Sequence, residues 1–204
     1  MGTGDTQTKT LPTYAGINNI MQIALGNSHA IAVDKDGYVW TWGNNDYGQL
    51  GNGKTGGVSL EKVKVKSPDG EGYLENIVAV AAGNLFSIAL DKDGNVYGWG
   101  YNYYGVLGQG DTSTRKLPTK VEGLEGIIKI EAANQSVFAI DNKNKLWAVG
   151  YNGYGNLGNN STQERLEFSR VIEKIETTET EEITYVSDVK TIRTGNNTAI
   201  AIKN

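Results

Sequence analysis

A glycine-rich motif occurs three times along the 204-residue chain. It reads VWTWGNNDYGQLG around Gly43, VYGWGYNYYGVLG around Gly100 and LWAVGYNGYGNLG around Gly150, which gives periods of 57 and 50 residues. A second block precedes each copy, as ALGNSHAIAVDKDG, AAGNLFSIALDKDG and AANQSVFAIDNKN, and a fourth version, RTGNNTAIAIKN, ends at Asn204. Repeats of this length with several short strands each are typical of propellers and β-solenoids.

Each repeat is predicted to form four antiparallel strands, which we name A to D. In the second repeat they cover residues 77–82, 86–90, 95–99 and 117–121. An Asp-Gly pair at 36–37 and again at 93–94 lies between strands B and C, which is a strong hairpin signal. Asn144 takes the place of that glycine in the third repeat, because asparagine tolerates positive φ better than most residues. We predict no helix, and we interpret the acidic stretch 173–182 as a strand or an insertion.

The two blocks together resemble the repeat of a known family. The pairing of G-N-x-x-(S/A)-x-A-(V/L/I)-D with W-G-x-N-x-x-G-x-L-G is similar to the repeat of the regulator of chromosome condensation (RCC1) family, and the resemblance covers residues 11–204. It implies an all-β fold, a β-propeller of four-stranded antiparallel blades, usually seven in a ring. The chain departs from the pattern at Ala133 and Val149, which replace a glycine and a tryptophan, and it keeps the family's frequent histidine only as His29.

The division into repeats predicts an incomplete ring. Residues 1–10 form an N-terminal tail or a cloning remnant. The propeller segment then comprises strand D of a split blade (11–19), three whole units (20–76, 77–126 and 127–188) and a partial fourth unit (189–204). About three and a half blades leave strand edges unpaired at both ends. Either the chain is a segment of a longer propeller, or chains associate, in which case a dimer would supply six whole and two composite blades.

The composition excludes several kinds of site. The chain has no cysteine and one histidine, which excludes disulfides, thiol nucleophiles and most histidine metal sites. The net charge of −4 gives no basic footprint for nucleic acid, and the longest apolar run, 77–82, is too short to span a bilayer. We expect no cofactor, no metal, no nucleic-acid partner and no membrane insertion. The composition is typical of a bacterial protein, without a signal peptide in this sequence, and leaves a cell-surface, extracellular or cytoplasmic location open.

One motif points to nucleotide binding but is contradicted by its own repeats. Residues 48–55 fit the phosphate-loop pattern G-x-x-x-x-G-K-[ST], yet residues 56–58, Gly-Gly-Val, begin no helix whose N-terminus could face phosphates. Asp111 and Ser161 stand in the other two copies where this one has Lys54. We therefore interpret the match as a conformational glycine loop.

The candidate binding residues lie in the loops of one face. In an A-B-C-D meander the A–B and C–D loops leave the same face of the ring, and these loops carry most of the variation between repeats. Tyrosine, asparagine and serine there offer contact area and adaptable hydrogen bonds on a rigid scaffold. The candidate partner-binding residues are His29, Asp46, Tyr47, Phe86, Tyr101, Tyr103, Tyr104, Gln135, Tyr151 and Tyr154. A structural interpretation stands beside this one, because Tyr47, Tyr104 and Tyr154 share one repeat position and could pack on a neighbouring blade.

Recurring glycines and asparagines are predicted to have structural roles. The glycines serve turns that require positive φ. They are Gly43, Gly48, Gly51, Gly100, Gly105, Gly108, Gly150, Gly155 and Gly158. The asparagines of the A–B loops are expected to hydrogen-bond loop backbone. They are Asn27, Asn84, Asn134 and Asn196.

No Ser/His/Asp set can be assembled from the sequence, so we predict a non-catalytic protein–protein interaction module that uses the A–B/C–D loop face. One alternative is a structural, self-assembling segment of a larger bacterial surface protein that closes its ring by oligomerisation. The family resemblance implies another, because the family includes an exchange factor for a small GTPase and propellers that inhibit β-lactamases. No exchange-factor residue can be matched to a position of this chain.

Overall fold

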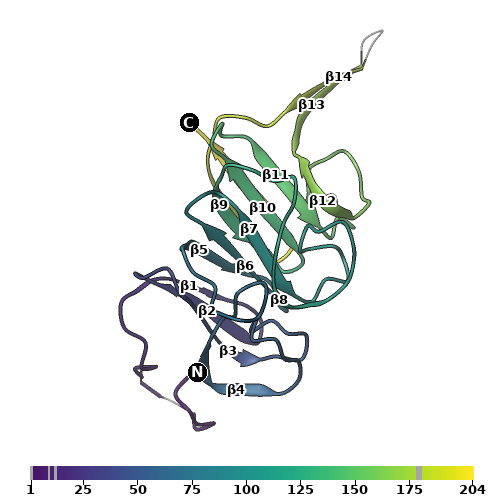
Figure 1. Ribbon diagram of the computed structural model, residues 1–204. Coiled ribbons are helices and arrows are strands. Elements are labelled where there is room, and N and C mark those ends of the chain that lie inside the picture. The colour runs from purple at the N-terminus through teal and green to yellow at the C-terminus, as the bar shows by residue number, and fades with distance from the viewer. Residues whose placement is uncertain (1, 9, 12, 178–180) are drawn as a thin grey trace.

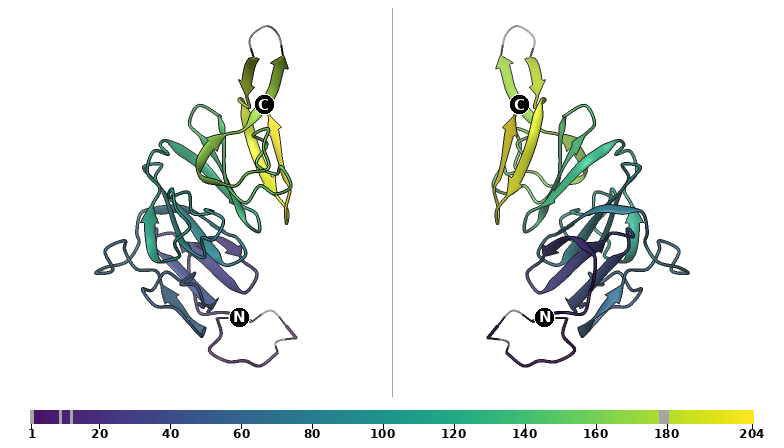
Figure 2. Two further views of the ribbon diagram at one scale, coloured as in Figure 1. Left: turned by 90° about the vertical axis from the view of Figure 1, so that its right-hand side faces the viewer. Right: turned by 90° about the vertical axis from the view of Figure 1, so that its left-hand side faces the viewer.

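The computed structural model describes residues 2–8, 10–11, 13–177 and 181–204. The described residues contain β-strands and no helix, and the strands form three four-stranded and two two-stranded antiparallel sheets. Figure 1 shows the sheets following one another as blades, and the views in Figure 2 show that they form an open arc. The prediction of an all-β propeller with an incomplete ring is confirmed.

Each complete blade is a meander whose strands A to D are neighbours in chain order. The first blade consists of β1 (Ile20–Leu25), β2 (His29–Asp34), β3 (Val39–Asn44) and β4 (Val58–Lys64). The second consists of β5 (Ile77–Ala82), β6 (Phe86–Asp91), β7 (Val96–Gly100) and β8 (Arg115–Lys120). The third consists of β9 (Ile127–Ala132), β10 (Ser136–Asp141), β11 (Leu146–Gly150) and β12 (Arg165–Arg170). Strands β15 (Val189–Thr194) and β16 (Ala199–Lys203) are A and B of a fourth blade.

A β-hairpin is inserted between the third blade and the fourth. It is formed by β13 (Ile172–Thr177) and β14 (Glu181–Tyr185), and Figure 1 shows it extending away from the blades. The Arg170 guanidinium lies 5.5 Å from the ring of Trp147 and 5.2 Å from that of Tyr185, which anchors the base of the hairpin to the third blade. The structure thus has strands in the acidic stretch 173–182, whose residues 178–180 lie outside the described part.

The N-terminal segment differs from the prediction. Residues 11–19, expected to be strand D of a split blade, form no strand at the positions that the structure describes. The segment instead runs beside the first blade, where the Gly4 N–H donates to the Leu60 carbonyl (3.0 Å) and Lys62 donates to that of Ala15 (3.4 Å). The physical reason is pairing: a strand must satisfy its backbone groups on a neighbour, and among the described residues no strand C lies beside β16 for residues 11–19 to pair with.

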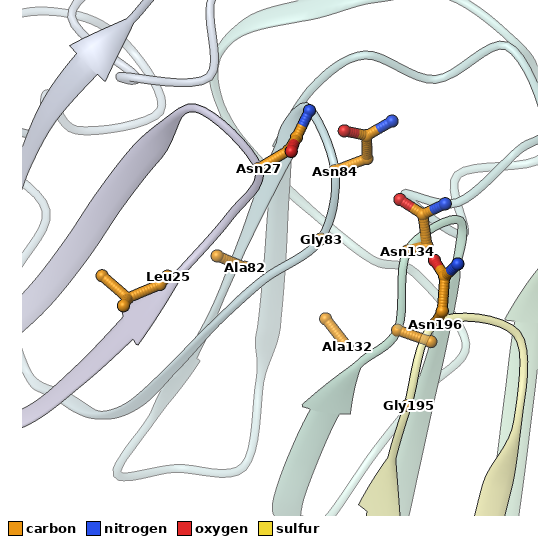
Figure 3. A pocket seen from close by; sticks show the side chains of 10 residues that line it. Leu25, Asn27, Ala82, Gly83, Asn84, Ala132, Asn134, Gly195 and Asn196 are labelled. Carbon is orange, nitrogen blue, oxygen red and sulfur yellow. The ribbon is translucent and has the colours of Figure 1, made fainter.

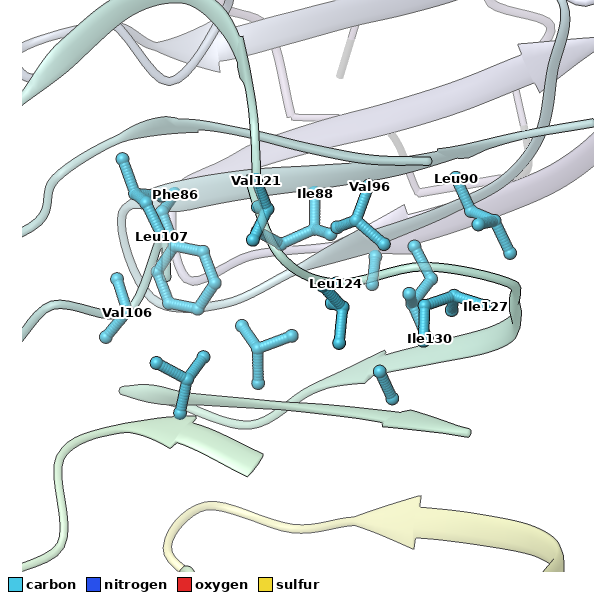
Figure 4. Packing of buried hydrophobic residues seen from close by; sticks show 14 residues of the cluster. Phe86, Ile88, Leu90, Val96, Val106, Leu107, Val121, Leu124, Ile127 and Ile130 are labelled. Atoms are coloured by element: carbon cyan, nitrogen blue, oxygen red, sulfur yellow. The ribbon is translucent and has the colours of Figure 1, made fainter. Parts of the chain in front are cut away.

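The hydrophobic core lies between the blades. At each junction strand A of one blade packs against strands A and B of the preceding blade, so that β5 meets β1 and β2, β9 meets β5 and β6, and β15 meets β9 and β10. Figure 4 shows the middle junction, where Phe86, Ile88 and Leu90 of β6 face Ile127 and Ile130 of β9. Burial of these side chains joins blades that have no hydrogen-bonded ladder in common.

A glycine bulge ends strand C of every blade. Gly43, Gly100 and Gly150 have φ values of 103°, 102° and 106°, and the ladder to strand D shifts register at each of them. A Cβ at these positions would lie 2.5–2.6 Å from a carbonyl oxygen of the A–B loop, so a larger residue cannot be placed there. The other six motif glycines, Gly48, Gly51, Gly105, Gly108, Gly155 and Gly158, and Asn144 (57°) also have positive φ.

Candidate functional site

The A–B and C–D loops of each blade are joined on one face. The N–H of the first C–D loop residue donates to a carbonyl of the A–B loop, from Asn44 to Ser28 (2.8 Å) in the first blade. The equivalent bonds run from Tyr101 to Leu85 (3.0 Å) and from Tyr151 to Gln135 (2.8 Å). These bonds hold the two loops of each blade together as one surface.

A buried asparagine holds each C–D loop in shape. The three residues are Asn45, Asn102 and Asn152. In each, Oδ1 accepts from the backbone N–H five residues further on, and Nδ2 donates to a carbonyl nine residues further on, at 2.8–3.1 Å. These residues are the asparagine of the recurring G-x-N-x-x-G-x-L-G motif, and although none was predicted as a site residue, their recurrence in all three copies is a signal that could have found them.

A continuous row of tyrosines crosses this face, and we call it the tyrosine ladder. Its consecutive ring centroids are 4.9–6.3 Å apart. Its members, in order, are Tyr47 from the first blade, Tyr101, Tyr103 and Tyr104 from the second, and Tyr151 and Tyr154 from the third. The structure therefore brings together six of the ten candidate residues, on three blades.

Three exposed rings and three supporting rings make up the ladder. Tyr47, Tyr103 and Tyr154 are 39%, 65% and 73% exposed, whereas the other three are half-buried. Tyr47 packs edge-on against Tyr101, and Tyr104 packs edge-on against Tyr151, in each case across a blade junction. Each such aromatic pair contributes about 0.5–1.5 kcal/mol beyond burial, so the supporting rings hold the exposed ones in place.

The polar groups beside the ladder suit hydrogen bonding. Burial, and after it the neighbouring rings of Tyr104, Tyr47 and Tyr103, raises the pKa of Tyr101, so its hydroxyl remains a neutral donor and acceptor. Asp46 is exposed next to Tyr47, and its Oδ2 accepts from the Asn44 side chain at 2.7 Å. Gln135 is half-buried in the A–B loop of the third blade.

Two of the candidate residues lie inside the protein. His29 is 5% exposed and Phe86 is 1% exposed, so neither can contact a partner on the surface. Both begin a strand B rather than standing in the A–B loop, and alternation along the strand turns them towards the following blade. His29 reaches across that junction, where its Nε2 lies 3.0 Å from the Ser87 Oγ.

The asparagines of the A–B loops form a row across successive blades, as Figure 3 shows. The N–H of Asn27 donates to the carbonyl of Asn84 (3.2 Å), Asn84 donates to Asn134 (2.8 Å), and Asn134 donates to Asn196 (3.1 Å). These bonds join main chains of successive blades. An open cavity of about 260 Å³ lies along the row, with Leu25 among the residues of its wall.

The glycine loop at residues 48–55 has no helix behind it. Lys54 and Thr55 are exposed, and the chain continues directly into strand β4. Among the described residues there is no cluster of three His, Asp or Glu side chains that could hold a metal ion, and no helix that is long and apolar enough to cross a membrane.

Known proteins with related sequences match part of this chain. E3 ubiquitin-protein ligase HERC2 from Homo sapiens is 36% identical over 129 residues, which is 61% of this chain and 3% of that protein. The ultraviolet-B receptor UVR8 from Arabidopsis thaliana is 44% identical over 102 residues, which is 50% of this chain and 22% of that protein. The chain thus spans only a small part of each of these relatives.

Solved structures show the same fold over nearly the whole chain. Human WBSCR16 superposes with a TM-score of 0.73 at 22% identity, covering 91% of this chain and 45% of that one. Prp20p from Saccharomyces cerevisiae, whose structure is described together with its binding to Gsp1p and histones, superposes with a TM-score of 0.74 at 20% identity, covering 92% and 44%. The Regulator of chromosome condensation (RCC1) repeat matches residues 36–90 and 93–140, and a second model of that repeat matches 20–49 and 77–106. With just over half of its residues matched, this chain belongs to the RCC1 repeat family.

Proposed function

We propose that the chain is a non-catalytic module that binds a protein partner through the tyrosine ladder. The observation that carries the proposal is the exposure of Tyr47, Tyr103 and Tyr154 on supporting rings that are themselves packed across blade junctions. Prp20p, a propeller of the same fold, has described protein-binding properties, which supports this class of function.

The ladder has the physical properties of a protein-binding surface. Tyrosine buries a large area on binding and loses little side-chain entropy, because it has only two flexible torsion angles. The supporting rings reduce that loss further, since the exposed rings are already held by edge-to-face contacts. Binding energy in protein interfaces is concentrated in a few aromatic and arginine residues, so Tyr103 and Tyr154 are the expected hot spots.

The test is a double variant, Tyr103→Ala with Tyr154→Ala. Both side chains project into solvent, so their removal leaves the blade cores intact. Proteins captured from a lysate by the wild type are identified by mass spectrometry, and each is then purified and titrated against wild type and variant by calorimetry. We expect a partner whose dissociation constant rises at least about 30-fold, which corresponds to about 2 kcal/mol at one hot spot.

The matched control is Tyr14→Ala. Tyr14 is 67% exposed, close to the 65% of Tyr103, but belongs to the N-terminal segment and not to the ladder. It should leave the affinity of the same partner unchanged. If every captured partner binds the double variant as tightly as the wild type, the role of the ladder is refuted.

A further inference from the structure

Strand β1 exposes an apolar side chain at a repeat position that is buried elsewhere. Ile23 is 54% exposed, whereas the equivalent residues of the following three blades, Val80, Ile130 and Ile192, are 1%, 5% and 1% exposed. In those blades the residue packs against the preceding blade. Leu25, two residues further on, is 72% exposed. The first blade therefore presents an unfilled junction face along β1.

Strand β16 presents the opposite half of a junction. Ile200 and Ile202 are 68% and 53% exposed. Their equivalents on strand B of the complete blades are 0–2% exposed, because they pack against the following blade. These equivalents are Ile31 and Val33, Ile88 and Leu90, and Phe138 and Ile140. One end of the arc thus carries the residues that the other end would bury.

The uncovered face of the first blade is the part that strands A and B of a preceding blade would cover. Its outer part is already covered, since Ile17 of the N-terminal segment packs with Ala30, Ala32 and Trp42, and Gly2 lies against the Trp42 ring. What remains open is β1, the strand that strands A and B of a preceding blade would contact, as β1 and β2 contact β5. Among the described residues, strands β15 and β16 form an A–B pair that is joined to no further strand.

We propose that this face binds a second copy of the chain, head to tail. The head is the face along β1, and the tail is the β15–β16 half-blade. The β15–β16 half-blade of one copy packs on β1 of the other, with Ile200 and Ile202 against Ile23 and Leu25. The junction repeats the three that already exist inside each chain, in which strands A and B of one blade pack on strand A of the next. Packing of this kind buries apolar side chains that are otherwise in water.

The row of A–B loop asparagines supplies a hydrogen bond for this junction. Within the chain each asparagine N–H donates to the carbonyl of its successor, from Asn27 to Asn84, from Asn84 to Asn134 and from Asn134 to Asn196. The row leaves the N–H of Asn196 at one end and the carbonyl of Asn27 at the other, and neither has a backbone partner among the described residues. In the proposed junction the Asn196 N–H of one copy donates to the Asn27 carbonyl of the second.

A head-to-tail contact uses two different surfaces, so it closes only when the second tail meets the first head. The chain covers 44–45% of the length of two solved propellers of its fold, so two copies approach the length of one such ring. We therefore propose a dimer with two identical junctions. This inference does not depend on the tyrosine ladder, because the C–D loops take no part in it.

The experiment measures the mass of the 204-residue chain in solution by sedimentation equilibrium over a range of concentrations. The expected result is a species of twice the 22.0 kDa of one chain. Ile23→Asp and Ile200→Asp should each raise the dissociation constant at least about 30-fold, because each places a carboxylate in the apolar junction. The control is Ile128→Asp, on strand A of the third blade, where the side chain is 57% exposed and lies at no open end. It should leave the dimer unchanged.

Mixing the two variants separates a head-to-tail contact from a symmetric one. The Ile23→Asp copy keeps an intact tail and the Ile200→Asp copy keeps an intact head, so the mixture should form a heterodimer through one intact junction. If β1 instead paired with β1, Ile200→Asp would have no effect, and this result would overturn the proposal. A wild type that sediments as a single chain at the highest concentration reached would also overturn it, and would assign the open face to another occupant, such as further blades of a longer polypeptide.

Discussion

Acid should destabilise this protein through its one histidine. His29 lies at the junction of the first and second blades, 5% exposed, with its Nε2 on the Ser87 Oγ and with no hydrogen-bond partner for Nδ1 among the described residues. Burial lowers the pKa of His29 from 6.5 to about 4, while the Phe86 backbone partly offsets this effect. The folded protein therefore holds the imidazole neutral over a pH range in which the unfolded chain protonates it.

The magnitude follows from the difference between the two pKa values. Because the folded-state value is the lower one, the contribution of His29 to stability is complete above the unfolded pKa of 6.5 and is lost as the pH falls towards about 4. At about 1.4 kcal/mol per unit, the whole difference is about 3 kcal/mol. About 2.5 kcal/mol of it is lost between about pH 7 and about pH 4.5.

The assay is urea unfolding, followed by tryptophan fluorescence, at several pH values for the wild type and for His29→Phe. Phenylalanine fits the site, because Phe86 fills the same repeat position in the second blade and lies against Gly83 as His29 lies against Gly26. We expect the free energy of unfolding to fall by about 2.5 kcal/mol more in the wild type than in the variant.

The titration of carboxylates does not affect the difference in stability loss between the wild type and His29→Phe. Burial raises the pKa of Asp141, but hydrogen bonds from Trp147 and from the Lys145 and Lys143 backbone outweigh it and lower that pKa overall. Stability from such groups is also lost in acid, but equally in both proteins, so it cancels in the difference. Equal losses in wild type and variant between pH 7 and 4.5 would refute the reasoning.

Two further predictions concern stability, measured as the urea midpoint with an unchanged m-value. Asp34→Ala should destabilise the first blade by about 2–4 kcal/mol, because the Asp34 carboxylate accepts from two backbone N–H groups and the Trp40 indole, whereas exposed Asp36→Ala should change stability by less than about 0.5 kcal/mol. Gly100→Ala should destabilise by more than about 3 kcal/mol, since its Cβ would lie 2.6 Å from the Leu85 carbonyl oxygen, whereas Gly123→Ala, with nothing within 4 Å, should lose only about 1 kcal/mol of backbone preference.

The fold could be predicted from the sequence because one signal was repeated. The strands predicted for the second repeat agree with β5, β6, β7 and β8 to within two residues at each end. The Asp-Gly turns and the glycine bulge recur at fixed distances from apolar runs, so each copy supports the assignment of the others. The prediction failed for the N-terminal segment. Its sequence resembles strand D, but it has no neighbouring strand C among the described residues with which to pair.

The side chains of the site were harder to predict than its loops. Sequence reasoning placed His29 and Phe86 on the loop face, but they begin strand B, in which every residue of these two blades is buried. The tyrosines were predicted from their positions in the C–D loops. What the sequence could not show was that Tyr47 and Tyr101, 54 residues apart, touch across a junction.

The proposed binding surface and the proposed assembly surface are physically separate. The ladder forms where one blade carries a tyrosine at the position of Tyr47 and the next carries one at the position of Tyr101. The first blade has Asn44 at that second position, and the described strands of the fourth half-blade are only β15 and β16, so a second copy docked on β1 adds no ring to the ladder. Loss of a partner in a ladder variant that still dimerises, and of the dimer in an Ile23 variant that still binds, would therefore separate the two proposals.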